Sequence, residues 1–304
     1  MSLGEIVDRL LRFEGTGELL ALDFVQQSLI AGALLALVAG ALGPLVVARQ
    51  ISFAVHGTSE LTFTGAAAAL LVSSSLVSMG ALVGALTAAL VFGLLGLRER
   101  ERDSVIGAVL AFGLGLGGLF LWLYPGRASN QLSLLFGQIV AVGRSDVWLL
   151  AGCALVLLGV LAAVWRPLLF ASMDAEVARA RGVPVRALSV LFAVLVGVAT
   201  GLAVPTVGAL LVLSLLITPA AAAARVTANP VTALLLATLF AEIAVLGGIV
   251  LSLAPGAPIS AYVTAIAFVI YLICRGVGAL RPRRVGHAHP APAPAAAEFG
   301  VVRS

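Results

Sequence analysis

Long apolar runs, separated by short polar segments, occupy most of this chain of 304 residues. Most of the runs reach the roughly 17 to 25 residues that an α-helix needs to span a bilayer. They lie at about 24–48, 61–78, 79–97, 104–124, 147–164, 187–204, 207–224, 231–253 and 259–280. The pattern therefore predicts an all-α, polytopic membrane protein with about nine transmembrane helices. Only Ser78, Met79 and Gly80 separate the second run from the third, so eight and ten spans are alternatives.

Polar segments flank the predicted membrane domain, which covers residues 24–280. Residues 1–23 are amphipathic, with five acidic residues and two arginines. They contain no basic stretch followed by a cleavage site, so a cleaved signal peptide is not expected. Residues 281–304 predict a flexible tail, because they are rich in Pro and Ala. His287 and His289 are interpreted either as ordinary residues of this tail or as a site that captures metal in the cytosol.

The composition is that of a membrane protein. Hydrophobic residues make up 61% of the chain and charged residues 11%, and the mean hydropathy is +1.15. In a soluble domain about a quarter of the residues are charged. All eighteen basic residues are arginine, and the abundance of Ala, Val, Leu and Gly suggests a bacterial genome of high GC content. Cys153 and Cys274 lie inside apolar runs and are expected to be small buried residues.

The arginines predict the orientation of the chain, since short Arg-rich loops stay on the cytoplasmic side of a membrane. Clusters of arginine fall at 98–103, 165–186 and 281–284, and a further arginine lies at 225. Even numbers of spans separate these positions, so one topology places all of them in the cytoplasm, together with a loop at 49–60 and the C-terminus. The N-terminus and the segments 125–146 and 254–258 then lie outside. The net charge of +4 is thus explained by arginines that set the membrane orientation. No nucleic-acid partner is expected.

The chain contains no recognisable catalytic or nucleotide-binding motif. The phosphate-binding loop, H-E-x-x-H, G-x-S-x-G and the dinucleotide fingerprint are all absent from the sequence. A transporter of this kind must therefore draw its energy from an ion gradient or from a separate ATPase subunit.

The cytoplasmic segment 165–188 bears on that choice. Asp174 to Arg181 predict a short helix, because acids lie near its start and arginines near its end. Gly182 is well placed as the C-cap, with a proline two residues later. Such a helix at the membrane surface is what a permease needs to dock into a groove of a nucleotide-binding subunit, with Asp174, Glu176 and Gly182 as the coupling residues. An ordinary solvated loop is the alternative.

Several stretches, taken together in this order and spacing, resemble the permease subunits of the bacterial zinc/manganese ABC importers. They are GPLVVARQISF (43–53), DSVIGAVLAFGLGLG (103–117), LSLLFGQIVAV (132–142), MDAEVARARGVPV (173–185) and VGALLVLSLLITPAAAAAR (207–225), followed by PGAPIS. The resemblance covers about 24–280. It implies the permease of a type II ABC importer in the bacterial cytoplasmic membrane, without a permanently bound cofactor. It also implies three partners: a second permease copy, expected to form a homodimer, a cytoplasmic ATP-binding subunit and an extracytoplasmic metal-binding protein.

The stretch FAVHGTSELTF (53–63) departs from the pattern of that family. The family carries an aspartate and, four residues later, a histidine at the start of the second span. In an alignment without gaps this chain has His56 at the aspartate position and Glu60 at the histidine position. Residues four apart share one face of a helix, so the two side chains can converge on one cation, and this ligand set suits Zn²⁺ or Mn²⁺. A solvated polar pair at the cytoplasmic interface is the alternative.

Glu242 lies near the middle of the run 231–253. An ionisable side chain at that depth usually faces a cavity or a polar partner. Glu242 is therefore a further candidate ligand on the metal pathway, and a structural glutamate hydrogen-bonded to a neighbouring helix is the alternative.

The remaining polar positions are interpreted mainly as structural. Thr218 and Pro219 are expected to interrupt and bend the seventh span near a gate, and Asp103 is expected to cap the fourth. Three amides of the external segment, Asn130, Gln131 and Gln138, are interpreted either as an exposed loop or as a contact for the binding protein.

These observations predict the permease subunit of an ATP-binding cassette importer that moves a divalent transition metal into the cytoplasm. Zinc is slightly favoured over manganese, because the histidine and glutamate add no hard oxygen ligand. The chain is not expected to be an enzyme, since ATP hydrolysis belongs to the separate subunit. The alternative is a secondary transporter driven by protons or sodium, with Glu60 and Glu242 as titrating groups. That alternative predicts inverted repeats, which inspection of the sequence does not find.

Reporter fusions test the predicted orientation. Fusions after residue 102 and after residue 284 are expected to report the cytoplasm, because both follow Arg-rich segments. A fusion inside 254–258 is expected to report the opposite side and serves as the control. A periplasmic signal from either of the first two fusions contradicts this topology.

Overall fold

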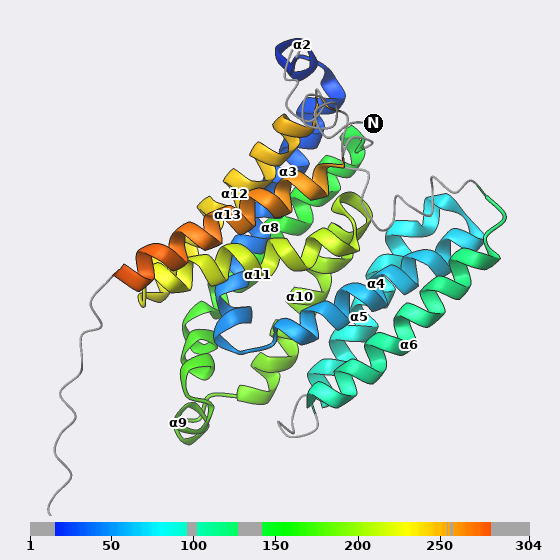
Figure 1. Ribbon diagram of the computed structural model, residues 1–304. Helices are drawn as coiled ribbons and strands as arrows, with labels where there is room; N and C mark the ends of the chain where they lie inside the picture. Colours follow the sequence, from blue (N-terminus) through cyan, green and yellow to red (C-terminus); the bar gives the residue numbers. More distant parts are fainter. Residues whose placement is uncertain (1–15, 96–101, 127–141, 254, 256–257, 281–304) are drawn as a thin grey trace, which may run out of the picture.

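The computed structural model describes residues 16–95, 102–126, 142–253, 255 and 258–280 (Figure 1). Within these ranges the chain is helical apart from short connections and has no β-strand. The helices are α2 (Thr16–Leu20), α3 (Asp23–Ala48), α4 (Ser52–Val72), α5 (Val77–Leu95), α6 (Arg102–Leu123), α8 (Arg144–Met173), α9 (Ala175–Ala180), α10 (Val185–Val207), α11 (Ala209–Val226), α12 (Pro230–Leu253) and α13 (Ile259–Leu280). The predicted all-α class is confirmed.

Each of the nine predicted apolar runs coincides with one long helix of the described chain. In the part of the chain that the structure describes, seven helices are long and apolar enough to cross a membrane: α3, α6, α8, α10, α12, α13, and α5 together with the short 3-10 turn before it. The other two fall short for different reasons. The 21 residues of α4 include several polar side chains that lower its hydropathy. The helix α11 has only 18 residues, the fewest of these nine.

The start of α4 corrects the predicted cytoplasmic loop at 49–60. The helix begins at Ser52, so only residues 49–51 connect it to α3. The loop prediction is wrong because every polar side chain lowers the hydropathy of a segment, including one whose hydroxyl groups are satisfied inside a helix. In α4, however, the hydroxyl of Thr58 donates to the carbonyl of Ala54 at 2.8 Å, and two further threonines donate one turn back in the same way.

Two other helix boundaries also differ from expectation. The break between the second and third spans lies at Ser73–Leu76, where the Ser73 hydroxyl accepts from the amide of Ser75 at 3.3 Å. It does not lie at 78–80, which is inside α5. The helix α11 continues through Pro219, and the backbone leaves the helical conformation at Gly208 instead, with φ of 87°.

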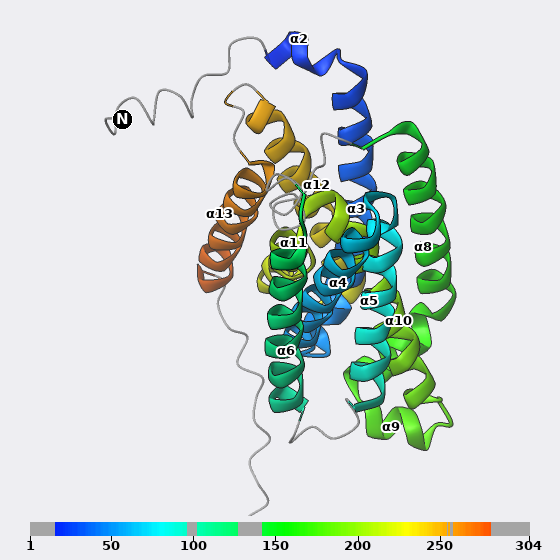
Figure 2. The ribbon, with the colours of Figure 1, turned by 90° about the vertical axis from the view of Figure 1, so that its right-hand side faces the viewer.

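Figure 1 shows α4, α5 and α6 side by side on one side of the molecule and α3, α12 and α13 on the other. The helices α10 and α11 join the two groups, since α10 packs against α5 and α4 while α11 packs against α13, α3 and α4. In the second view α8 and α13 lie at opposite sides (Figure 2). The helices α2 and α9 lie at opposite ends of the molecule in both views, as the predicted topology requires.

The outer helices present large apolar side chains outward. Phe112 and Trp122 on α6, Trp148 and Leu155 on α8 and Leu235 on α12 are all more than half exposed. In a soluble protein such a surface would be unstable, but here it matches the hydrocarbon of a bilayer. Cys274 is buried, as expected, and Cys153 is partly buried against the core.

Glycines allow α4 and α5 to approach closely. A Cβ atom added at Gly84 would meet the backbone carbonyl of Leu61 and lie 3.2 Å from the Cα of Gly65, and one added at Gly80 would meet the carbonyl of Gly65. Small residues at such crossings bring two backbones into van der Waals contact, which is a main source of helix association in membranes. This contact fixes α4 against α5.

Gly84→Ala is expected to destabilise the protein by about 1–3 kcal/mol, because the methyl group overpacks the α4–α5 contact. The unfolding temperature of the detergent-purified protein measures the effect. Gly115→Ala on α6 is the matched control, since an added Cβ there meets nothing within 4 Å. Equal unfolding temperatures for the two variants would contradict the close-packing argument.

Candidate functional site

The first half of α4 carries a set of buried polar side chains. They are Thr58, Ser59, Glu60, Thr62 and Thr64. Glu60 is only 7% exposed, and α4 is covered by α5, α6, α10 and α11. A helix with this many buried polar groups must be held by hydrogen bonds to its neighbours or serve a polar cargo.

Two of these side chains bond to neighbouring helices. The hydroxyl of Ser59 donates to the backbone carbonyl of Ala209, at the start of α11, at 3.0 Å. The hydroxyl of Thr64 donates to the carbonyl of Gly113 on α6 at 2.7 Å. These bonds fix the rotation of α4 about its own axis and thereby the direction of Glu60, which lies between them in sequence.

His56 and Glu60 lie one turn apart within α4. The imidazole is half-buried and lies one helical turn before the buried carboxylate. Both are therefore placed on one helix face, as their spacing predicts. An imidazole nitrogen and a carboxylate oxygen together can bind a divalent transition metal, and two ligands from one chain leave positions open for water or further ligands.

The structure does not bring Glu242 to this pair. Glu242 lies on α12, which packs against α3, α11 and α13. Among the residues that the structure describes, no three His, Cys, Asp or Glu side chains gather closely enough to hold a metal ion. Glu242 is half-buried, next to the exposed Ile243 and one turn after Thr238, whose buried hydroxyl has no hydrogen-bond partner. It borders the outer surface of this chain.

The predicted helix after α8 is confirmed as α9. The side chain of Asp174 accepts from the amides of Glu176 at 3.0 Å and Val177 at 2.9 Å, which makes it the N-cap. Gly182 has φ of 80°, and the amide of Val183 donates to the carbonyl of Ala178 at 3.0 Å. The helix is thus closed at both ends, as the sequence predicts.

This helix lies at one end of the molecule (Figures 1 and 2). Ala178 is buried against the body of the protein, while Glu176, Val177, Arg179 and Arg181 are exposed. A short rigid helix with an exposed, charged outer side is suited to bind another protein. Its contact with an ATPase stays a prediction.

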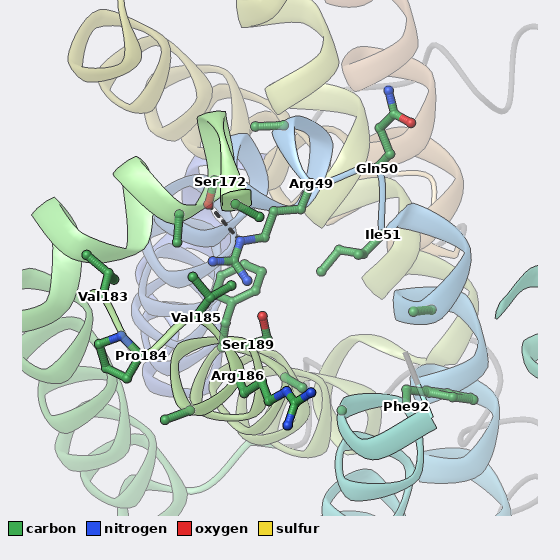
Figure 3. Close-up of a pocket in the computed structure, with 18 of the residues that line it drawn as sticks. Arg49, Gln50, Ile51, Phe92, Ser172, Val183, Pro184, Val185, Arg186 and Ser189 are labelled. Carbon is green, nitrogen blue, oxygen red and sulfur yellow. Dashed lines mark hydrogen bonds between the residues drawn. The ribbon is translucent and has the colours of Figure 1, made fainter. Parts of the chain in front are cut away.

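A cavity of about 830 Å³ lies beside α9, and sequence reasoning missed it. It opens between the α3–α4 turn, the end of α5, α9 and the start of α10 (Figure 3). Among the residues that the structure describes, three arginines line it, namely Arg49, Arg179 and Arg186, and no acidic residue does. The sequence signal was present at Arg49, an arginine that directly follows the first apolar run, but only the fold brings it to α9.

The other sequence predictions have mixed outcomes. Asp103 lies in the first turn of α6, where a negative charge favours the helix dipole, but the helix begins one residue before it. The amides at 130, 131 and 138 and the two tail histidines lie outside the described residues.

A family model named ABC 3 transport family matches residues 21–277. The chain belongs to this family. It is therefore a multi-pass protein of the bacterial cytoplasmic membrane with the fold of an ABC importer permease. The family membership confirms the resemblance found in the sequence and covers all the long helices apart from the last residues of α13.

Individual members of the ABC 3 family are similar over most of their length. The manganese transport system membrane protein MntC of Halalkalibacterium halodurans is 30% identical over 236 residues, which cover 77% of this chain and 80% of that protein. The high-affinity zinc uptake system membrane protein ZnuB of Haemophilus influenzae is 25% identical over 228 residues, covering 74% and 86%. The structure of PsaBC from Streptococcus pneumoniae in complex with Fab matches with a TM-score of 0.75 and 26% identity, over 90% of this chain and 95% of the matched chain.

Proposed function

We propose that this ABC 3 family chain is the membrane permease of an importer for a divalent transition metal. The observation that carries the proposal is the His56–Glu60 pair on α4, with Glu60 buried and His56 half-buried, in a chain of this family. Relatives over most of the chain are named for manganese transport and for zinc uptake. ATP hydrolysis belongs to a separate subunit, and a carrier driven by an ion gradient is not favoured by the family membership.

The pair suits a site that binds its metal briefly. An isolated buried carboxylate is costly in a membrane protein, so Glu60 gains from a cationic cargo. A transport site must also release its ion. Two ligands from this chain, with water in the remaining positions, bind a metal less tightly than a closed four-ligand structural site. Glu242 remains a separate candidate on the pathway because it lies on another helix group.

The ligand set and the names of the relatives point to different ions, Zn²⁺ and Mn²⁺. An imidazole with a single carboxylate favours Zn²⁺ slightly over the harder Mn²⁺. The first relatives by similarity are nevertheless named for manganese. We propose that both ions enter the site and that the reversed order of the two ligands sets their relative uptake.

Metal uptake into vesicles tests the role of the pair. The variants His56→Ala, Glu60→Ala and Glu60→Gln are each reconstituted together with the ATPase and the binding protein. Uptake of Zn²⁺ and Mn²⁺ is expected to fall by about 10- to 100-fold, at least the loss that removal of an outer-shell partner causes in metal sites. Thr62→Ser, which keeps the hydroxyl group on the same helix, is the control. Wild-type uptake in both His56→Ala and Glu60→Ala would refute the assignment, and the same assay on Glu242→Gln decides its role separately.

Deletion of residues 174–181 tests the docking of α9. The deletion is expected to abolish transport and co-purification of the ATPase while the protein remains in the membrane, because α9 lies outside the helix bundle. Glu176→Arg should weaken the association by reversing an exposed charge, whereas Glu18→Arg, also exposed but at the opposite end of the molecule, should not. If the deleted protein still transports metal and binds its ATPase, α9 is not the docking helix.

A further inference from the structure

Arg49 links the α3–α4 turn to the end of α8. Its Nε donates to the hydroxyl of Ser172 at 2.7 Å, and its Nη2 lies 3.4 Å from the carbonyl of Leu168 (Figure 3). The Ser172 hydroxyl in turn donates to that same carbonyl at 2.6 Å. Ser172 lies two residues before Asp174, the N-cap of α9. Arg49 is thus hydrogen-bonded to the end of α8, directly before α9 begins.

The same guanidinium also contacts the helix that follows α9. Its carbon lies 5.0 Å from the centre of the Phe192 ring, on α10, within the range of a cation–π interaction. Arg49 therefore touches both of the helices that flank α9. If α9 moves together with Ser172 and Phe192, Arg49 must move as well.

The turn that carries Arg49 is short and constrained. Only three residues connect α3 to α4, and Gln50 has φ of 53°, a left-handed conformation that residues other than glycine rarely adopt. The amide of Ile51 donates to the carbonyl of Val46 at 3.1 Å. Surrounding contacts must maintain such a turn. A displacement of Arg49 is therefore transmitted to Ser52, where α4 begins. Ser52 lies one helical turn before His56.

The cavity beside Arg49 leaves room for this movement. It is bounded by the α3–α4 turn on one side and by α9 and α10 on the other. Ile51 and Ser189 face its open centre (Figure 3). The contacts of Arg49 join the two sides of this cavity.

We propose that Arg49 is a positioning residue that couples α9 to the metal pair: it transmits displacement of the ATPase-docking helix to the first turns of α4, where His56 and Glu60 lie. The inference rests on the proposed function, because it assumes that α9 meets the ATPase and that the pair handles the metal. A merely structural role would make Arg49 important for folding but would leave the ATP used for each transported ion unchanged.

The test compares ATP hydrolysis with metal uptake for the full complex in vesicles. The variants are Arg49→Gln, Arg49→Lys and Ser172→Ala, and the controls are Arg166→Gln, an exposed arginine on α8, and Ser189→Ala, in the cavity wall. In Arg49→Gln the ATP hydrolysed per ion transported is expected to rise on the order of tenfold, within the usual size of coupling effects. Ser172→Ala should raise it less, and Arg49→Lys should partly restore the wild-type ratio.

The double variant Arg49→Gln/Ser172→Ala should be no worse than Arg49→Gln alone, because the two residues act through one contact. An unchanged ratio in Arg49→Gln overturns the inference while the proposed function stands, provided that the α9 deletion still releases the ATPase. If Arg49→Gln fails to assemble, Ser172→Ala decides: a wild-type ratio there overturns the inference, and a raised ratio supports it. Retention of the ATPase and of transport after the α9 deletion instead refutes the docking role of α9, and wild-type metal uptake in both His56→Ala and Glu60→Ala refutes the proposed metal pair.

Discussion

The polar side of α4 is the constraint on which the rest of the fold depends. The hydrocarbon core of a bilayer offers no water, so polar groups at that depth must find partners inside the protein. Thr58, Ser59, Glu60, Thr62 and Thr64 are all buried. Because α4 cannot face lipid, it takes the central position, and the strongly apolar helices α6, α8, α12 and α13 supply the outer surface.

The hydrogen bonds of α4 also explain an unusual feature of its neighbour. The connection between α10 and α11 is the single residue Gly208, and the residues on either side of it, Val207 and Ala209, are both buried. Non-helical backbone within a membrane protein is tolerated where protein covers it. The φ of 87° suits glycine, which has no Cβ. The break places the Ala209 carbonyl where Ser59 can donate to it, next to Glu60 in sequence.

The proposed metal pair and the proposed docking helix therefore belong to one connected structure. α4 holds the pair between α11 and α6, and the turn before α4 reaches α8 and α10 through Arg49. An importer must change the access of a binding site in step with ATP hydrolysis elsewhere. The path that we propose between the two runs through a three-residue turn and one guanidinium group, and it is short enough to transmit a displacement without losing it in flexible loops.

The sequence by itself determined the all-α class, the nine apolar runs, the family and the helix α9 with its C-cap glycine. These properties follow from local composition and spacing, which a linear chain displays directly. Only the tertiary structure showed that α4 starts at Ser52, because the cost of His56 and Glu60 in a membrane depends on which helices cover them. The fold also decided that Glu242 lies apart from the pair and that Arg49 meets Ser172. Those two relations join residues far apart in the chain, and their distances depend on how the helices pack rather than on any local pattern.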